Sequence, residues 1–209
     1  MKKAAVPYLF LKRCMDIFGA VTGLLVTLPI QMILMVFYHF GDNKGPVLFK
    51  QARIGKQGRT FYIYKFRSMV VDAERILKED QELYTKYVRN NFKLEQHEDP
   101  RITPFGRFIR RTSLDELPQF YNVLKGDMSL VGPRPVVVDE IKEYKHTKDD
   151  FLSVKPGITG YWQVCGRSGI GYPERVDIEL YYVYNRGLLF DLKILWKTIY
   201  QVLARKGAY

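Results

Sequence analysis

Asp115 and Glu116 are adjacent carboxylates inside the segment 113–135, SLDELPQFYNVLKGDMSLVGPRP. An ionised aspartate can attack an electrophile, an ionised glutamate can accept a proton, and either can bind Mg²⁺ through its oxygens. The same two residues could instead cap a helix and complement its dipole. Considered alone, the pair favours this structural role, so the neighbouring residues must decide between the two interpretations.

Arginines flank the acidic pair on both sides. They are Arg101, Arg107, Arg110, Arg111 and Arg134. Because a guanidinium group presents a rigid fork of donors to two oxygens, a cluster of arginines beside a helix N-terminus is typical of a phosphate site. We expect these positive charges to keep both carboxylates ionised at pH 7 and to lower the basicity of Asp115.

The acidic pair should begin a short helix that ends before Gly126. The apolar residues at helical spacing are Leu117, Phe120, Tyr121 and Leu124. Asp115 is the expected N-cap, because Pro118 then falls at the third helical position. The N–H groups of the first helical turn have no partner within the helix, so a proline there costs no hydrogen bond. A second helix is expected over 136–144, behind Pro135, where it would support the turn that carries Arg134.

Residues 47–69 predict a β-hairpin, because apolar and polar residues alternate and Gly55 and Gly58 separate the two runs. Lys65 and Arg67 then share one face of the second strand. They could reach the acidic pair, or they could simply guard a solvated edge. The mixed charge of residues 71–89 predicts a surface helix without chemistry.

The segment 155–167, KPGITGYWQVCGR, joins a Pro-Gly turn to an aromatic residue and an amide. Trp162 and Gln163 could hold a nucleobase by stacking and by hydrogen bonds to its edge. Core packing is an equally good interpretation, because tryptophan is mostly buried wherever it occurs.

An uncharged run extends from residue 17 to residue 41 and is long enough for one transmembrane helix. Pro29 lies near its middle, where it removes a backbone hydrogen bond and favours a bend. Each arm is then roughly 18 Å long, short of the ~30 Å hydrocarbon core. Thr27 is expected to satisfy the carbonyl that Pro29 leaves free.

Basic residues flank this run on both sides, so the positive-inside rule gives neither end a preference for crossing. We therefore predict a re-entrant helix, with both ends on one side, over 1–41, and a catalytic domain over 42–209. The apolar stripe of residues 191–206, interspersed with lysines and an arginine, predicts an amphipathic helix that lies at the membrane interface or docks on the core.

The charge balance predicts an anionic partner. Lysine and arginine outnumber aspartate and glutamate by 33 to 22, a net charge of +11. Nucleic acid, an anionic bilayer and a phosphorylated substrate all fit this charge. Cys14 and Cys165 form neither a disulfide framework nor a zinc pattern, which favours a reducing, cytosolic environment.

Four stretches carry a family resemblance. They are KRCMD at 12–16, GPVLFKQARIGKQGRTFYIYKFRSM at 45–69, DPRITPFGRFIRRTSLDELPQFYNVLKGDMSLVGPRP at 99–135, and the segment at 155–167. In this order they resemble bacterial sugar transferases that are monotopic polyprenyl-phosphate phosphoglycosyl transferases. The resemblance implies an α/β (α+β) catalytic domain with an N-terminal re-entrant helix hairpin, on the cytoplasmic face of the bacterial inner membrane.

The resemblance also implies a reaction. A sugar 1-phosphate passes from a UDP-sugar to polyprenyl (undecaprenyl) phosphate and UMP leaves, with Asp115 as nucleophile and Glu116 as base or metal ligand. Asp115 and Glu116 would hold Mg²⁺. The residues expected to bind substrate phosphate are Lys65, Arg67, Arg110, Arg111 and Arg134. The residues expected at the nucleotide are Pro133, Pro135, Trp162 and Gln163. The segment 166–183 most resembles members that act on UDP-galactose or UDP-glucose.

Two other classes of function remain open at this stage. A nucleic-acid-binding domain would explain the charge, but the paired acids would repel a phosphate backbone, so we expect no nucleic acid partner. A non-catalytic scaffold on an anionic membrane surface would explain the apolar run, but it would not need adjacent carboxylates. The expected partners are UDP-sugar, polyprenyl phosphate and anionic lipids, and the sequence also allows a homodimer.

Overall fold

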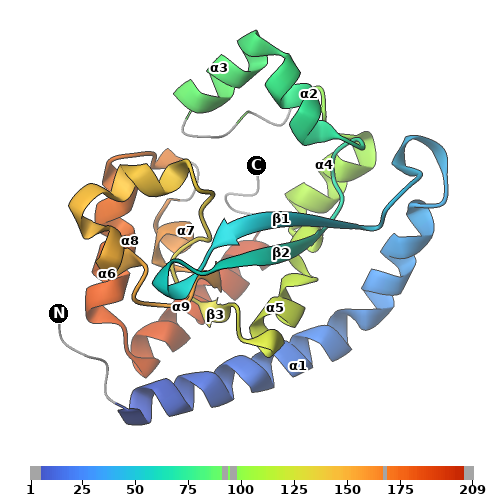
Figure 1. The fold of residues 1–209 in the computed structure, drawn as a ribbon. Coiled ribbons are helices and arrows are strands. Elements are labelled where there is room, and N and C mark those ends of the chain that lie inside the picture. The colour runs from blue at the N-terminus through green and yellow to red at the C-terminus, as the bar shows by residue number, and fades with distance from the viewer. Residues whose placement is uncertain (1–5, 91–93, 95–97, 167–168, 205–209) are drawn as a thin grey trace.

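The computed structural model describes residues 6–90, 94, 98–166 and 169–204. Helices surround a β-hairpin and a second, smaller sheet, so the expected α+β class is confirmed (Figure 1). The elements are α1 Val6–Phe37, β1 Leu48–Ile54, β2 Thr60–Phe66, α2 Ala73–Glu79, α3 Gln81–Arg89, α4 Pro104–Arg111, α5 Gln119–Lys125, β3 Ser129–Val131, α6 Lys148–Phe151, β4 Gly157–Thr159, α7 Tyr161–Cys165, α8 Glu174–Asn185 and α9 Leu188–Leu203.

The expected hairpin over 47–69 is confirmed. β1 and β2 are antiparallel, with Leu48 opposite Phe66 and Ile54 opposite Thr60. The reversal between them uses a left-handed Gly58, with φ of 74°. The second sheet pairs β3 with β4 in parallel, and this pairing joins the segment after the acidic pair to the segment 155–167.

Two predicted helices differ in the structure. The surface helix of 71–89 is divided into α2 and α3 at Asp80, whose carboxylate accepts a hydrogen bond from the Leu83 amide at 2.9 Å and so starts α3. The helix expected over 136–144 is wrong, because the Val136 carbonyl instead accepts from the Ile54 amide at 3.0 Å and extends the edge of β1. A 3₁₀ helix follows at Glu140–Thr147.

α1 is one continuous helix that passes through Pro29, and it bends as it follows one edge of the domain (Figure 1). Within the described chain, it is the helix long and apolar enough to cross a membrane. Thr27 donates its hydroxyl to the Gly23 carbonyl at 2.6 Å, so the expectation that it would satisfy the carbonyl facing Pro29 is wrong.

Small residues let α1 approach the domain closely. A Cβ added to Gly19 would lie 2.5 Å from a methyl carbon of Leu130, and one added to Gly23 would lie 2.7 Å from the Phe120 ring. Ala20, between them, is fully buried in the main core. These contacts dock α1 onto α5 and β3, the elements that follow the acidic pair.

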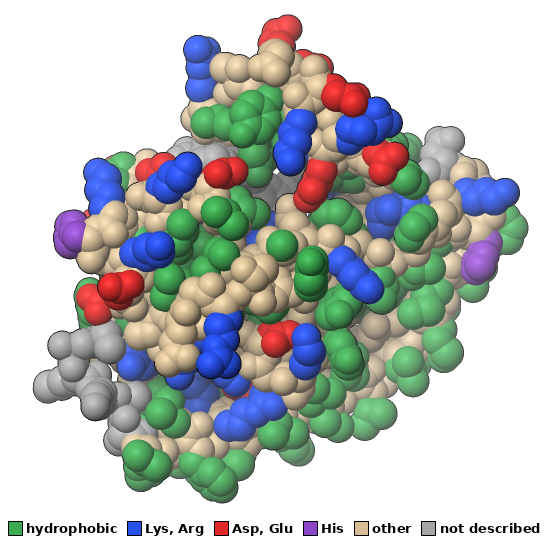
Figure 2. Space-filling view, in the orientation of Figure 1, with side chains coloured by type: hydrophobic (Ala, Val, Ile, Leu, Met, Phe, Trp, Pro, Cys, Tyr) green, Lys and Arg blue, Asp and Glu red, His purple; other side chains and the backbone are tan. Residues whose placement is uncertain are grey.

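Apolar side chains cover the outer face of α1, and Figure 2 shows them gathered along that edge of the molecule. α9 has a similar exposed face, formed by Leu189, Leu192, Trp196, Ile199 and Tyr200. Its inner face carries the fully buried Ile194 and Asp191. α9 is therefore docked on the core by one face and presents an exposed apolar face on the other.

Replacing Gly23 should test the close approach of α1. Gly23→Val would push side-chain carbon into the Phe120 ring, and we expect it to lower the free energy of unfolding by about 1–3 kcal/mol. Thermal unfolding of the purified chain in detergent measures this loss. Thr22→Val, on the exposed side of the same helix, is the matched control and should leave the transition unchanged. Equal unfolding temperatures for the two variants would contradict the packing.

Candidate active site

A 3₁₀ turn, Leu114–Glu116, carries the acidic pair between α4 and α5. The Leu117 amide donates to the Leu114 carbonyl at 3.3 Å, three residues back. Pro118 has no N–H with which to continue an α-helical pattern, so α5 begins only at Gln119. The expectation that Asp115 caps this helix is therefore wrong, whereas the left-handed Gly126 at its end is confirmed.

Asn122 fixes α5 against the hairpin and so sets the position of the turn. Its amide nitrogen donates to the Tyr62 carbonyl at 2.7 Å, and its amide oxygen accepts from the Tyr64 amide at 3.0 Å. The side chain is fully buried, and it forms with the edge of β2 the hydrogen bonds that a neighbouring strand would otherwise form. The next residue of β2 is Lys65, which consequently faces the acidic pair.

Lys65 is the cation nearest the two carboxylates. Its Nζ lies 2.6 Å from Glu116 Oε1 and 3.9 Å from Asp115 Oδ2. The side chain of Asp115 is 9% exposed, whereas that of Glu116 is 38% exposed. The two neighbours thus differ in environment, and only Glu116 has a direct hydrogen bond from Lys65.

Burial sets the proton affinity of Asp115. Loss of hydration and the charge of Glu116 raise the pKa of Asp115, Lys65 and Arg110 lower it, and the net result is a pKa of about 6. The expectation that the arginines would lower its basicity is therefore wrong. For Glu116, burial acts in the same direction, but Lys65 and Arg134 outweigh it and hold the pKa below its usual range. Both carboxylates are mainly ionised at pH 7.

The structure brings two of the expected phosphate-binding arginines toward the pair. Arg110 acts electrostatically on Asp115 and donates from Nε to Ser68 Oγ at 2.8 Å. Arg134 acts on Glu116, and its Nη1 lies 3.1 Å from Glu140 Oε2. Arg111 is exposed at the end of α4.

Arg67 and Arg101 have partners within the fold. Arg67 is buried and donates to the backbone carbonyls of residues 43, 46 and 69, so it holds the loop that follows α1. Arg101 forms a buried ion pair with Asp99 at 2.7 Å. Both guanidinium groups therefore have their hydrogen-bond partners within the fold.

Two buried glutamates behind Arg134 were missed by the sequence analysis. Glu140 accepts from Arg175 at 3.3 Å as well as from Arg134. Glu179 accepts from the Arg134 amide at 3.2 Å, from Arg175 Nε at 3.3 Å, and from the hydroxyl of Tyr144. The one available signal was the spacing of Arg175 and Glu179, four residues apart on α8.

The expected nucleotide residues lie around this network. Trp162 is buried, donates from Nε1 to the Ile170 carbonyl at 3.0 Å, and has the Arg175 guanidinium 4.4 Å from its ring centroid. The carbonyl of Pro133 accepts from the Gly157 amide at 2.9 Å, and that of Pro135 from Arg53 at 3.1 Å.

Gln163 differs from the other nucleotide candidates, because its buried Oε1 has no hydrogen-bond partner among the described residues. Residues 167 and 168 of the segment 166–183 lie outside the described part of the chain, as do the basic residues before Val6 and after Ala204.

The donor set of the acidic pair fits Mg²⁺. No group of three acidic, histidine or cysteine ligands occurs among the described residues. Mg²⁺ is commonly held by one or two carboxylates and completes its octahedron with water and substrate phosphate oxygens. Asp115 and Glu116 supply that number of carboxylates, beside cations suited to the remaining phosphate charge.

The structure thus combines a helix long and apolar enough to cross a membrane with paired carboxylates and nearby cations, which are features suited to phosphate groups near a membrane. This chain belongs to the family described as bacterial sugar transferase, which matches residues 7–205. The monotopic family named from the sequence motifs is thereby supported at the level of the whole chain.

Three relatives illustrate the family. Undecaprenyl-phosphate galactose phosphotransferase of Salmonella typhimurium is 47% identical over 203 residues, 96% of this chain and 42% of that protein. Exopolysaccharide production protein ExoY of Sinorhizobium fredii is 40% identical over 202 residues, 95% of this chain and 88% of that protein. UDP-glucose:undecaprenyl-phosphate glucose-1-phosphate transferase of Escherichia coli is 38% identical over 207 residues, 95% of this chain and 41% of that protein. The chain thus spans less than half the length of the first and third of these relatives.

The raised pKa of Asp115 has a consequence for stability. Its folded-state value of about 6 lies above the ordinary 3.8, so the protonated carboxyl stabilises the fold at low pH, and this contribution is lost as the pH rises through 6. Asp115→Asn should therefore stabilise the protein at pH 8 by about 1–3 kcal/mol and have little effect near pH 4.

Chemical denaturation in detergent with EDTA, at both pH values, measures this difference. Asp139→Asn removes an exposed carboxylate and should change neither value. A stabilisation of equal size at the two pH values would contradict burial as the cause.

Proposed function

We propose that this protein transfers a sugar 1-phosphate from a UDP-sugar to polyprenyl phosphate at the cytoplasmic face of the bacterial inner membrane. The observation that carries the proposal is the ionised pair, Asp115 and Glu116, set beside Lys65 and Arg110 on a domain packed against a membrane-type helix. The names of the relatives, which include a galactose phosphotransferase and a glucose-1-phosphate transferase, support this donor and acceptor.

Asp115 is the proposed nucleophile. One carboxylate oxygen forms a bond to the phosphorus that carries the sugar, the bond from that phosphorus to the bridging oxygen breaks, and UMP leaves with the electron pair. Burial leaves Asp115 more basic than a solvated aspartate, and greater basicity favours attack. Lys65 and Arg110 offset the negative charge that an incoming diphosphate would otherwise meet.

The second step releases Asp115. An oxygen of the polyprenyl phosphate attacks the same phosphorus, the bond to Asp115 breaks, and polyprenyl-diphosphate-sugar forms. Glu116 is the candidate to accept a proton from the acceptor phosphate, since Lys65 keeps it ionised. Mg²⁺ held by the two carboxylates would supply neutralising charge to the phosphates.

The helix contacts support a re-entrant topology. Near one end of α1, Lys12 pairs with Asp191 at 2.8 Å and Asp16 accepts from Ser129 at 2.9 Å. Directly after the other end, the Tyr38 hydroxyl donates to the Arg67 carbonyl at 2.6 Å. With both ends bonded to one folded domain, we expect both ends of the helix on the same side of the bilayer as that domain.

We expect a covalent intermediate on Asp115. Incubation with Mg²⁺ and UDP-galactose or UDP-glucose, without acceptor, should release at most one UMP per enzyme and add a sugar phosphate to the protein. Intact-mass analysis and peptide mapping measure the adduct. Asp115→Asn should form none, whereas Glu116→Gln should form it and turn over slowly.

Asp139→Asn is the matched control for this experiment and should behave as wild type. If no adduct forms, and UMP leaves only after polyprenyl phosphate has bound, then Asp115 is a metal ligand or base in a direct transfer. If no donor releases UMP even with acceptor and Mg²⁺, the transferase proposal itself is wrong.

The topology gives a separate expectation. In a Cys14→Ser, Cys165→Ser background, a membrane-impermeant thiol reagent applied to intact cells should label neither Lys3→Cys nor Asp139→Cys, because both lie on the cytosolic side. Permeabilised cells should give labelling of both. Labelling of Lys3→Cys alone in intact cells would indicate a helix that spans the membrane.

A further inference from the structure

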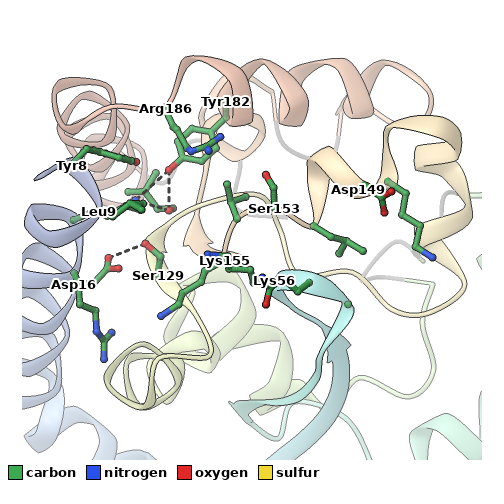
Figure 3. A pocket seen from close by; sticks show the side chains of 18 residues that line it. Tyr8, Leu9, Asp16, Lys56, Ser129, Asp149, Ser153, Lys155, Tyr182 and Arg186 are labelled. Atoms are coloured by element: carbon green, nitrogen blue, oxygen red, sulfur yellow. Dashed lines mark hydrogen bonds between the residues drawn. The ribbon is translucent and has the colours of Figure 1, made fainter. Parts of the chain in front are cut away.

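A pocket of about 920 Å³ is lined by residues other than the acidic pair. Figure 3 shows it from close by. It is bounded by the first half of α1, the turn between β1 and β2, the loop 152–155 and the end of α8. Asp115, Glu116, Lys65, Arg110 and Arg134 do not line it. The two sites are placed at opposite ends of α5, because the acidic pair precedes its first turn and Lys155 approaches Gly126 at its last.

Positive charge dominates the walls of this pocket. The cations are Lys12, Arg13, Lys56, Lys148, Lys155 and Arg186, against two aspartates. Lys12 is neutralised by Asp191, and Arg13 donates to the carbonyls of Val123 and Leu124 at 2.7 and 2.8 Å. These side chains hold α1 in place and leave the other cations to face the pocket.

Lys56 and Lys155 have no acidic partner within ion-pair distance in the described part of the chain. Both are labelled in Figure 3, in the middle of the pocket wall. Lys155 is half-buried, and burial together with the charges of Arg13 and Lys56 lowers its pKa. The protonated form of this lysine is therefore destabilised, and a bound anion would stabilise it again. The pocket is thus suited to an anion.

The remaining wall is apolar, and the pocket adjoins the membrane-type helix. Leu9, Leu152 and Val154 line it, and Val6 and Phe10 are exposed on the adjacent turns of α1. A ligand that matches these walls has a phosphate for the lysines and an apolar portion that continues along α1. A free nucleotide has only a compact base beside its phosphate, whereas a lipid has a long apolar chain that can follow α1.

We propose that this pocket binds the phosphate group of a membrane lipid, at a site separate from the acidic pair. The inference rests on the membrane association that the proposed function requires. Two lipids share this chemistry, an anionic phospholipid such as phosphatidylglycerol and polyprenyl phosphate itself. Phosphatidylglycerol is the ligand we expect, because an abundant lipid would occupy a site that the reaction does not turn over.

Lipid retention by the full chain in neutral detergent tests the proposal without a bilayer surface. Phosphatidylglycerol, phosphatidylcholine or polyprenyl phosphate is added, and native mass spectrometry measures the bound fraction. The double variant Lys56→Gln, Lys155→Gln should bind phosphatidylglycerol about fivefold more weakly for each lysine removed. Lys142→Gln, Lys193→Gln removes two charges outside the pocket and should bind as wild type.

Two further measurements keep the outcomes distinct. Lys56→Gln alone changes an exposed side chain and should still weaken binding about fivefold, so a folding defect at Lys155 cannot account for the result. Weakened binding of polyprenyl phosphate instead of phosphatidylglycerol would support the pocket and assign it to the acceptor.

Unchanged binding of both lipids by the double variant would overturn the proposal, and so would equal weakening in the control. UMP release by wild type is assayed in parallel. Its absence would count against the transferase reaction and leave the lipid result standing.

Discussion

The close packing of α1 against α5 is the constraint on which the rest of the structure depends. Gly23 lets α1 approach the Phe120 ring of α5 and Gly19 lets it approach Leu130 of β3, and the acidic pair lies directly before the first turn of α5. The position of Asp115 relative to the membrane-type helix is therefore set by a rigid contact within the fold. An acceptor whose tail lies in lipid and a donor dissolved in water can meet only at such a fixed depth.

The site also requires cations that lie near the carboxylates without neutralising both of them by direct ion pairs. Lys65 neutralises mainly Glu116, and Arg134 is shared with the buried Glu140. Asp115 keeps a raised pKa, because it has no hydrogen bond from Lys65 that would compensate for its burial. The charge of Arg134 acts on Glu116, and the buried Glu140 shares that charge.

Local signals in the sequence were sufficient for some elements. The hairpin over 47–69 follows from alternation and a glycine-containing turn, and the end of α5 follows from Gly126. The sequence also predicted arginines around the acidic pair, and the charges of Arg110 and Arg134 do act on it, whereas Arg101 pairs with Asp99. The Asp115 cap and the helix over 136–144 were wrong, because Pro118 enforces 3₁₀ geometry and β1 recruits Val136 from far along the chain.

The remaining features depend on distant contacts that no local pattern contains. The spacing of Lys65 and Arg67 places both side chains on one face of the strand, but it does not determine which group each side chain contacts. In the structure Lys65 contacts Glu116, whereas Arg67 donates to backbone carbonyls. The pKa of Asp115 likewise depends on burial by tertiary packing. Asn122 carries no chemical motif, yet its two hydrogen bonds to β2 determine which cation faces the site.

α5 links the two candidate sites physically. Its first turn follows the acidic pair, and its last carbonyls accept from Arg13, a residue of the lysine-lined pocket. Because α1 forms one wall of the pocket, a lipid phosphate held by Lys155 and Lys56 would bind best in the arrangement in which α1 is docked on the domain. By mass action it would stabilise that arrangement over any in which the helix has separated. The membrane would then act as a ligand that maintains the geometry of the acidic pair as well as the place where the two substrates meet.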